Sequence, residues 1–117
     1  MKSNQTCLKI LSCAAVLGLA LGSVGIKATG GEQKPTTHTV IIDASRFMPK
    51  VLTLKAGDTV LWINKDIVAH TATSQAAGFD SGTIKPGKSW KHTLTHSGEF
   101  AYLCSIHPLM KGTLQVK

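Results

Sequence analysis

The most informative part of this sequence is the stretch Glu99-Phe-Ala-Tyr-Leu-Cys104-Ser-Ile-His107-Pro-Leu-Met110-Lys-Gly112. It opens with a run in which Phe100 and Tyr102 alternate with other residues, as expected of a β-strand that buries one face. Cys104, His107 and Met110 then follow at intervals of three residues. We expect a tight loop of this kind, between two strands, to fold its three side chains around one point.

These three side chains are a thiolate, an imidazole and a thioether, and one distant histidine would add a second nitrogen ligand. A thiolate and two imidazoles in a trigonal plane, with a weak axial thioether, suit copper in an electron-transfer site. Zinc is more usually bound by a second cysteine, a third histidine or a carboxylate. Met110 therefore favours copper over zinc.

The distant ligand must be one of four other histidines: His38, His70, His92 and His96. His38 lies near a polar linker, and His96 lies in a Ser-Gly turn where we expect it to be solvated. His92 shares its parity with Trp90 and Leu94, so we predict a neutral core histidine that makes one or two hydrogen bonds. His70 is at the start of a β-like run and can meet the loop, so we predict it as the fourth ligand.

Short apolar or β-branched runs cover the rest of the chain and are separated by Gly, Pro, Asn and Asp residues. The seven candidate strands are Thr39–Ile42, Val51–Leu54, Thr59–Ile63, Ala69–Thr73, Ser89–Thr95, Glu99–Leu103 and Thr113–Val116. We find no sustained helical periodicity after the N-terminal segment. The pattern predicts an all-β fold, an antiparallel sandwich or barrel.

The N-terminal segment has the order of a secretory signal: a polar start with Lys2 and Lys9, then 17 uncharged residues up to Ile26. We predict a signal peptide at residues 1–29, a linker at 30–37 and one domain at 38–117. The uncharged stretch is also at the short limit for a membrane anchor, which is the alternative. Removal of the signal would take Cys7 and Cys13 with it and leave Cys104 as the only thiol.

The formal charge of the chain is +7, and from Glu32 onward ten basic and six acidic residues remain. The lysines are scattered, and no run of five or six basic residues accompanies aromatic side chains, so a nucleic-acid partner is not expected. The positive excess gives a mild preference for an acidic protein partner.

Several motifs together resemble the plastocyanin and amicyanin branch of the cupredoxins, the type 1 blue copper proteins. They are Phe47-Met-Pro49, Lys55-Ala-Gly-Asp-Thr-Val60, Trp62-Ile-Asn64, His70-Thr71, Gly98-Glu-Phe-Ala-Tyr102 and Cys104-Ser-Ile-His-Pro-Leu-Met110, and they cover nearly all of residues 38–117. The two-residue gap between His107 and Met110 is similar to amicyanin. The resemblance implies a Greek-key β-sandwich of seven to eight strands with one copper ion at its end.

By position, the family implies His70, Cys104 and His107 as equatorial ligands and Met110 as the axial ligand. Many relatives have Asn directly after the upstream histidine, where this chain has Thr71, whose hydroxyl could bond across to the loop near Ser105. We also expect an apolar patch beside the His107 imidazole, with a rim drawn from Met48, Pro49, Pro108 and Leu109.

The expected function is that of a periplasmic monomer, not an enzyme, which shuttles single electrons between redox proteins by Cu(I)/Cu(II) cycling. Its partners would be redox proteins such as c-type cytochromes or a periplasmic dehydrogenase, and the mature domain would not insert into a membrane. A copper carrier usually shows several open Met or His ligands, and a copper enzyme needs a free coordination position. A purely structural β-domain is the remaining alternative.

Overall fold

The computed structural model describes residues 33–117, and one compact unit spans Lys34–Lys117. The predicted signal peptide, residues 1–29, and the start of the linker lie outside the described residues. Within residues 33–117 there is no helix long and apolar enough to cross a membrane.

Nine strands make up the secondary structure of the described part of the chain. They are β1 (Thr37–Asp43), β2 (Arg46–Met48), β3 (Val51–Leu54), β4 (Thr59–Asn64), β5 (Thr73–Ser74), β6 (Phe79–Asp80), β7 (Ser89–Thr93), β8 (Gly98–Leu103) and β9 (Lys111–Val116). Six of the seven predicted runs correspond to strands within two residues at either end. The run Ala69–Thr73 is mostly loop: His70 forms an isolated bridge with Ile84, and β5 begins only at Thr73.

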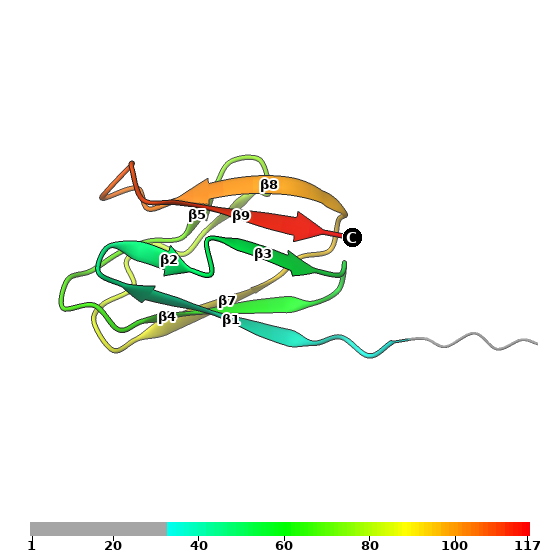
Figure 1. Cartoon of the computed structure of the whole chain (residues 1–117), viewed down its shortest axis with the longest axis horizontal. Helices are drawn as coiled ribbons and strands as arrows, with labels where there is room; N and C mark the ends of the chain where they lie inside the picture. The colour runs from blue at the N-terminus through cyan, green and yellow to red at the C-terminus, as the bar shows by residue number, and fades with distance from the viewer. Residues whose placement is uncertain (1–32) are drawn as a thin grey trace, which may run out of the picture. The chain divides into compact units, whose positions relative to one another are not determined.

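The strands form two sheets, in the orders β2-β1-β4-β7 and β3-β9-β8-β5-β6 (Figure 1). The all-β sandwich is confirmed. The predicted antiparallel arrangement holds for most strand pairs, but β1 pairs with β4 and β3 pairs with β9 in parallel. Short strands with tight turns favour antiparallel neighbours only between consecutive strands, and these two pairs are far apart in the sequence.

The core lies between the sheets and centres on Trp62 of β4, which is fully buried. The Trp62 ring lies 5.6 Å from Tyr102 of β8 and 5.5 Å from Trp90 of β7, measured between ring centroids. Alternate residues of β4, β8 and β9 face this core, as predicted for the strand with Phe100 and Tyr102, although Phe100 of β8 and Trp90 of β7 are only partly buried. Gly112 of β9 lies directly against Tyr102, and an added Cβ would lie 2.5 Å from the ring.

Three connections meet at one end of the sandwich, at the left of Figure 1. They are the β4–β5 connection (residues 65–72), the β6–β7 connection (81–88) and the β8–β9 loop (104–110). This end holds all four predicted metal ligands. Burial of alternate residues holds β4 and β8 in place in their sheets. The ends of these strands then determine where the loops begin and end.

Candidate metal centre

Three of the four predicted ligands converge. The Nδ1 atoms of His70 and His107 and the Sγ atom of Cys104 all lie within 4.8 Å of one another. The sulfur is 3.7 Å from Nδ1 of His70 and 3.8 Å from Nδ1 of His107. His70 and Cys104 are fully buried and His107 is partly exposed, so the centre lies just below the surface.

The β8–β9 loop is closed by its own backbone hydrogen bonds. The N–H of Cys104 donates to the carbonyl of Met110 at 3.0 Å, and the N–H of Met110 donates to the carbonyl of His107 at 2.8 Å. Met110, the fourth predicted ligand, is buried at 5 % exposure. The turn therefore holds three of the predicted ligands on one short, internally bonded segment.

His70 is fixed from two sides. Its backbone exchanges hydrogen bonds with Ile84, and its Nε2 lies 2.9 Å from Oδ2 of Asp66. Asp66 also accepts hydrogen bonds from the N–H groups of Ser45 and Ile67, and these bonds, first that of Ser45 and then that of His70, lower the pKa of its carboxyl. A carboxylate on one ring nitrogen orients the imidazole and leaves the other nitrogen for a metal.

Asp66 was not predicted from the sequence. Its only signal is a spacing of four residues from His70, which has a fixed meaning on a helix but none in a loop.

Thr71 connects the two segments that carry the ligands. Its N–H donates to the sulfur of Cys104 at 3.3 Å. Its hydroxyl lies 3.1 Å from the hydroxyl of Ser105 and accepts the N–H of Ser105 at 2.8 Å. The expected bond from Thr71 across to Ser105 is confirmed, so threonine performs a bridging role at this position.

The environment of Cys104 favours the thiolate. Burial raises the pKa of the thiol, but hydrogen bonds from the N–H of Thr71 and from the side chains of His70 and His107 outweigh it, and the pKa falls to about 6. A thiolate is the form that binds metals.

The spacing of the three donors fits a single metal ion. Bonds of about 2.3 Å to sulfur and about 2.0–2.1 Å to nitrogen, diverging by about 120°, separate the two donor atoms by about 3.8 Å. The observed separations are 3.7 and 3.8 Å. Both sulfur–nitrogen separations therefore match those of a trigonal metal site, and a thiolate with two imidazoles suits copper.

The other histidines lie elsewhere. The Nε2 atom of His38 lies 2.9 Å from the buried carboxylate of Asp58, and His96 is exposed and bonds to the Thr95 hydroxyl. His92 faces inward as predicted but makes no hydrogen bond with the described residues. Its ring instead stacks on Trp90 at 5.5 Å, and burial lowers its pKa.

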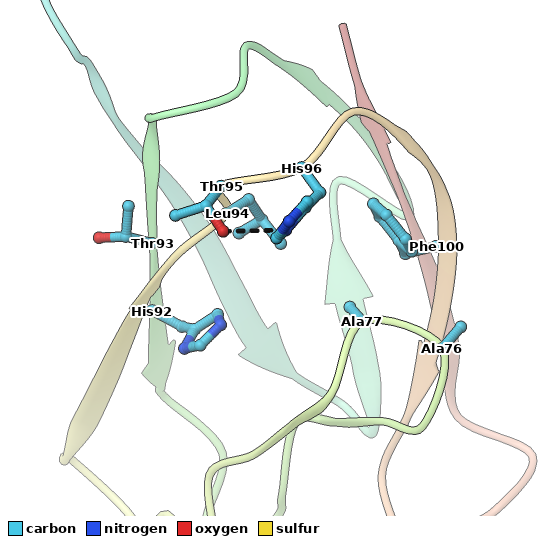
Figure 2. A pocket seen from close by; sticks show the side chains of 8 residues that line it. All are labelled: Ala76, Ala77, His92, Thr93, Leu94, Thr95, His96 and Phe100. Carbon is cyan, nitrogen blue, oxygen red and sulfur yellow. Dashed lines mark hydrogen bonds between the residues drawn. The ribbon is translucent and has the colours of Figure 1, made fainter.

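His92 and His96 line a cavity of about 180 Å³, and Figure 2 shows how their side chains lie. None of the residues that line this cavity is a predicted metal ligand. Because neither histidine belongs to the converging group, His70 is the predicted distant ligand that the fold brings to the loop.

Large apolar side chains are exposed on the β4–β5 connection, on the β8–β9 loop and at the last residue of β2. Leu109 is 94 % exposed and Met48 is 38 % exposed, and both were expected at the rim of a patch. Ile67, which is 89 % exposed, and the neighbouring Val68 and Ile106 were missed. Isolated apolar residues in predicted loops give no pattern from which exposure can be inferred.

Comparison with known proteins identifies the family. A model of the cupredoxin-like domain matches residues 12–116. The chain belongs to the cupredoxin-like family. The predicted family is confirmed, and with it the expected copper protein that carries electrons and is not an enzyme.

The similar proteins agree with this membership. Amicyanin of Paracoccus denitrificans is 29% identical, over 93% of this chain and 96% of the relative. Plastocyanin of Scenedesmus fuscus is 31% identical, over 61% of this chain and 86% of the relative. A reduced Cu(I) form of an amicyanin variant superposes with a TM-score of 0.64 at 29% identity, over 69% of this chain and 82% of that one. A purple cupredoxin from Nitrosopumilus maritimus has a TM-score of 0.64 at 28% identity, over 68% and 99% of the two chains.

Proposed function

We propose that His70, Cys104 and His107 bind one copper ion in a plane, that Met110 is its weak fourth ligand, and that the protein carries single electrons between redox proteins. The observation that supports this most directly is the convergence of one thiolate and two imidazole nitrogens within 4.8 Å. Copper, when bound, supplies a one-electron couple. The chain supplies the donor set and its geometry.

Four protein ligands leave no coordination position for a substrate, which favours electron transfer over catalysis at the metal. The ligands come from loops anchored on both sheets, and backbone hydrogen bonds fix them. Such a frame keeps the donors in one arrangement, so that oxidation and reduction require little movement.

His107 is the natural point of contact with a partner. Of the four proposed ligands, His70, Cys104 and Met110 are buried, whereas His107 is partly exposed. Exposed apolar side chains such as Leu109 and Ile106 flank it in the sequence. A partner that covers these side chains would bring its own cofactor close to the His107 edge.

We further propose that residues 1–29 are a signal peptide and that the domain acts as a monomer in the periplasm, with c-type cytochromes or a dehydrogenase as partners. N-terminal sequencing of the protein recovered from the periplasmic fraction would test export. An intact N-terminus in the membrane fraction would instead favour an anchor.

Titration of the purified metal-free protein with Cu(II) tests the copper site. We expect an intense blue colour at one equivalent, and we expect Cys104→Ala to abolish it. A chain in which Cys7 and Cys13 are both replaced by alanine is the matched control and should remain blue. A colourless Cu(II) complex of the parent chain would refute the proposed site and favour a structural domain.

Met110→Leu tests the axial ligand separately. Because a weak axial ligand tunes the metal more than it holds it, this variant should stay coloured and have a shifted reduction potential. An unchanged potential and spectrum would exclude Met110 from the ligand set.

A further inference from the structure

The acidic and basic side chains of residues 33–117 differ in number and in whether they have partners within the domain. Residues 33–117 contain ten Lys or Arg and five Asp or Glu, a formal excess of five positive charges. Both ion pairs of this part of the chain involve histidine, and no Lys or Arg of residues 33–117 is paired with a carboxylate. The basic groups are therefore free to act on an approaching molecule.

The carboxylates, in contrast, accept hydrogen bonds from other groups of the domain. Asp58 and Asp66 each accept three hydrogen bonds from the chain, including bonds from His38 and His70. Asp80 accepts bonds from Thr73 and Gly82. Asp43 and Glu99 each accept one further bond. The acidic groups thus hold loops together and do not pair with the lysines.

Basic side chains outnumber acidic ones at the metal end. Four of the ten lie on or directly after the three connections that meet there: Lys65, Lys85, Lys88 and Lys111. Arg46 begins β2 and Lys50 follows it, and all six of these side chains are exposed. Lys65 adjoins Asp66, the partner of His70, and Lys85 adjoins Ile84, which bridges to His70. Lys111 follows Met110 directly. Three acidic residues share this region: Asp43, Asp66 and Asp80.

We infer that this end of the protein docks an acidic electron-transfer protein, one whose cofactor edge is surrounded by carboxylates. The inference rests on the proposed electron-carrier function and names the chemistry of the partner. Exposed Ile67, Ile106 and Leu109 provide the apolar centre, and the unpaired lysines provide a positive rim. Complementary charge steers such a complex and sets its association rate.

The test uses the copper-loaded full chain in its reduced form and two small oxidants, anionic hexacyanoferrate(III) and cationic tris(phenanthroline)cobalt(III). The second-order rate constant with hexacyanoferrate should fall steeply as ionic strength rises, and the rate constant with the cobalt complex should rise. At about 0.01 M ionic strength, Coulomb's law over about 10 Å gives roughly a fivefold slower reaction of the trivalent anion for each lysine neutralised.

Lys65→Gln and Lys111→Gln are the test variants. Lys55→Gln is the matched control, because Lys55 is also an exposed lysine and directly follows β3, which ends at the opposite end of the sandwich (Figure 1). We expect the test variants to slow the reaction with hexacyanoferrate and the control to leave it within twofold of the parent.

Three outcomes would overturn parts of the reasoning in distinguishable ways. Rates that are independent of ionic strength, or equally affected by Lys55→Gln, would refute the acidic partner while leaving the electron carrier intact. A copper-loaded chain that exchanges electrons with neither oxidant would refute the proposed function itself. Sedimentation with phosphatidylglycerol vesicles at physiological salt, lost in the test variants, would replace the acidic protein with a lipid surface.

Discussion

Replacement of Thr71 by valine tests whether the bridge between the two ligand-bearing segments stabilises the fold. Valine keeps the shape and the β-branching of threonine but removes the hydroxyl. That hydroxyl lies 3.0 Å from Thr73 Oγ1 and 3.1 Å from Ser105 Oγ, and it accepts the N–H of Ser105 at 2.8 Å. Because Thr71 is only 4% exposed, water would replace these bonds poorly.

Each such hydrogen bond contributes about 0.5–1.5 kcal/mol net, so Thr71→Val should lower the free energy of unfolding by about 2 kcal/mol. For a domain of this size, that corresponds to a decrease in Tm of about 8–16 °C. Thermal unfolding followed by circular dichroism measures it in the metal-free protein. Thr71→Ser, which keeps the hydroxyl and loses one methyl group, is the control and should recover most of the loss.

The copper-loaded protein adds a second measurement. If the Thr71 bridge also sets the distance between His70 and Cys104, copper binds the variant less tightly, and Tm decreases by more in the loaded form than in the metal-free form. A Thr71→Val protein whose Tm stays within about 2 °C of the parent would contradict the claim that this hydroxyl joins the segments.

Three further predictions concern packing, pH and metal removal. Gly112→Ala would place a Cβ 2.5 Å from the buried Tyr102 ring. Calorimetry should therefore show a decrease of about 3 kcal/mol in the free energy of unfolding. An unchanged Tm would mean that the ring moves freely. Backbone hydrogen bonds lower the pKa of Asp58 from 3.8, so the carboxylate stabilises the fold above about pH 4 and loses this effect as the pH falls further. In acid titrations, Asp58→Asn should be less stable than the parent at neutral pH, and its stability should depend less on acid. An unchanged acid transition would contradict this. The amides of Cys104 and Met110 should exchange slowly with deuterium even without copper, because both donate hydrogen bonds within the loop; rapid exchange in the metal-free protein would show that the metal closes the loop.

The sequence predicted the local part of the site well. Cys104, His107 and Met110 are close in the sequence, and a loop between two strands brings them together with little dependence on the rest of the fold. The strands β4, β8 and β9 were predicted because alternate burial leaves a pattern with a period of two. The inward-facing Phe100 and Tyr102 of β8 were predicted for the same reason.

What the sequence could not give depends on contacts between distant segments. The strand β2 has only three residues, and β6 lies among glycines that mark a turn, so neither has a usable pattern. The parallel pairings of β1 with β4 and of β3 with β9 are properties of the assembled sheets. Asp66 was missed because its contact with His70 depends on the path of a loop, which no periodicity describes.

The position of His70 is fixed by hydrogen bonds to segments that are distant from the β8–β9 loop. Two backbone hydrogen bonds to Ile84 set the main chain, and Asp66 sets the ring, so that Nδ1 already lies 3.7 Å from the sulfur of Cys104. Metal binding that must first order a site loses part of its free energy to that ordering. Hydrogen bonds within the protein that hold His70 reduce that loss and keep the ligand frame in one arrangement. This is also what fast electron transfer needs, because a ligand frame that does not move adds little to the barrier.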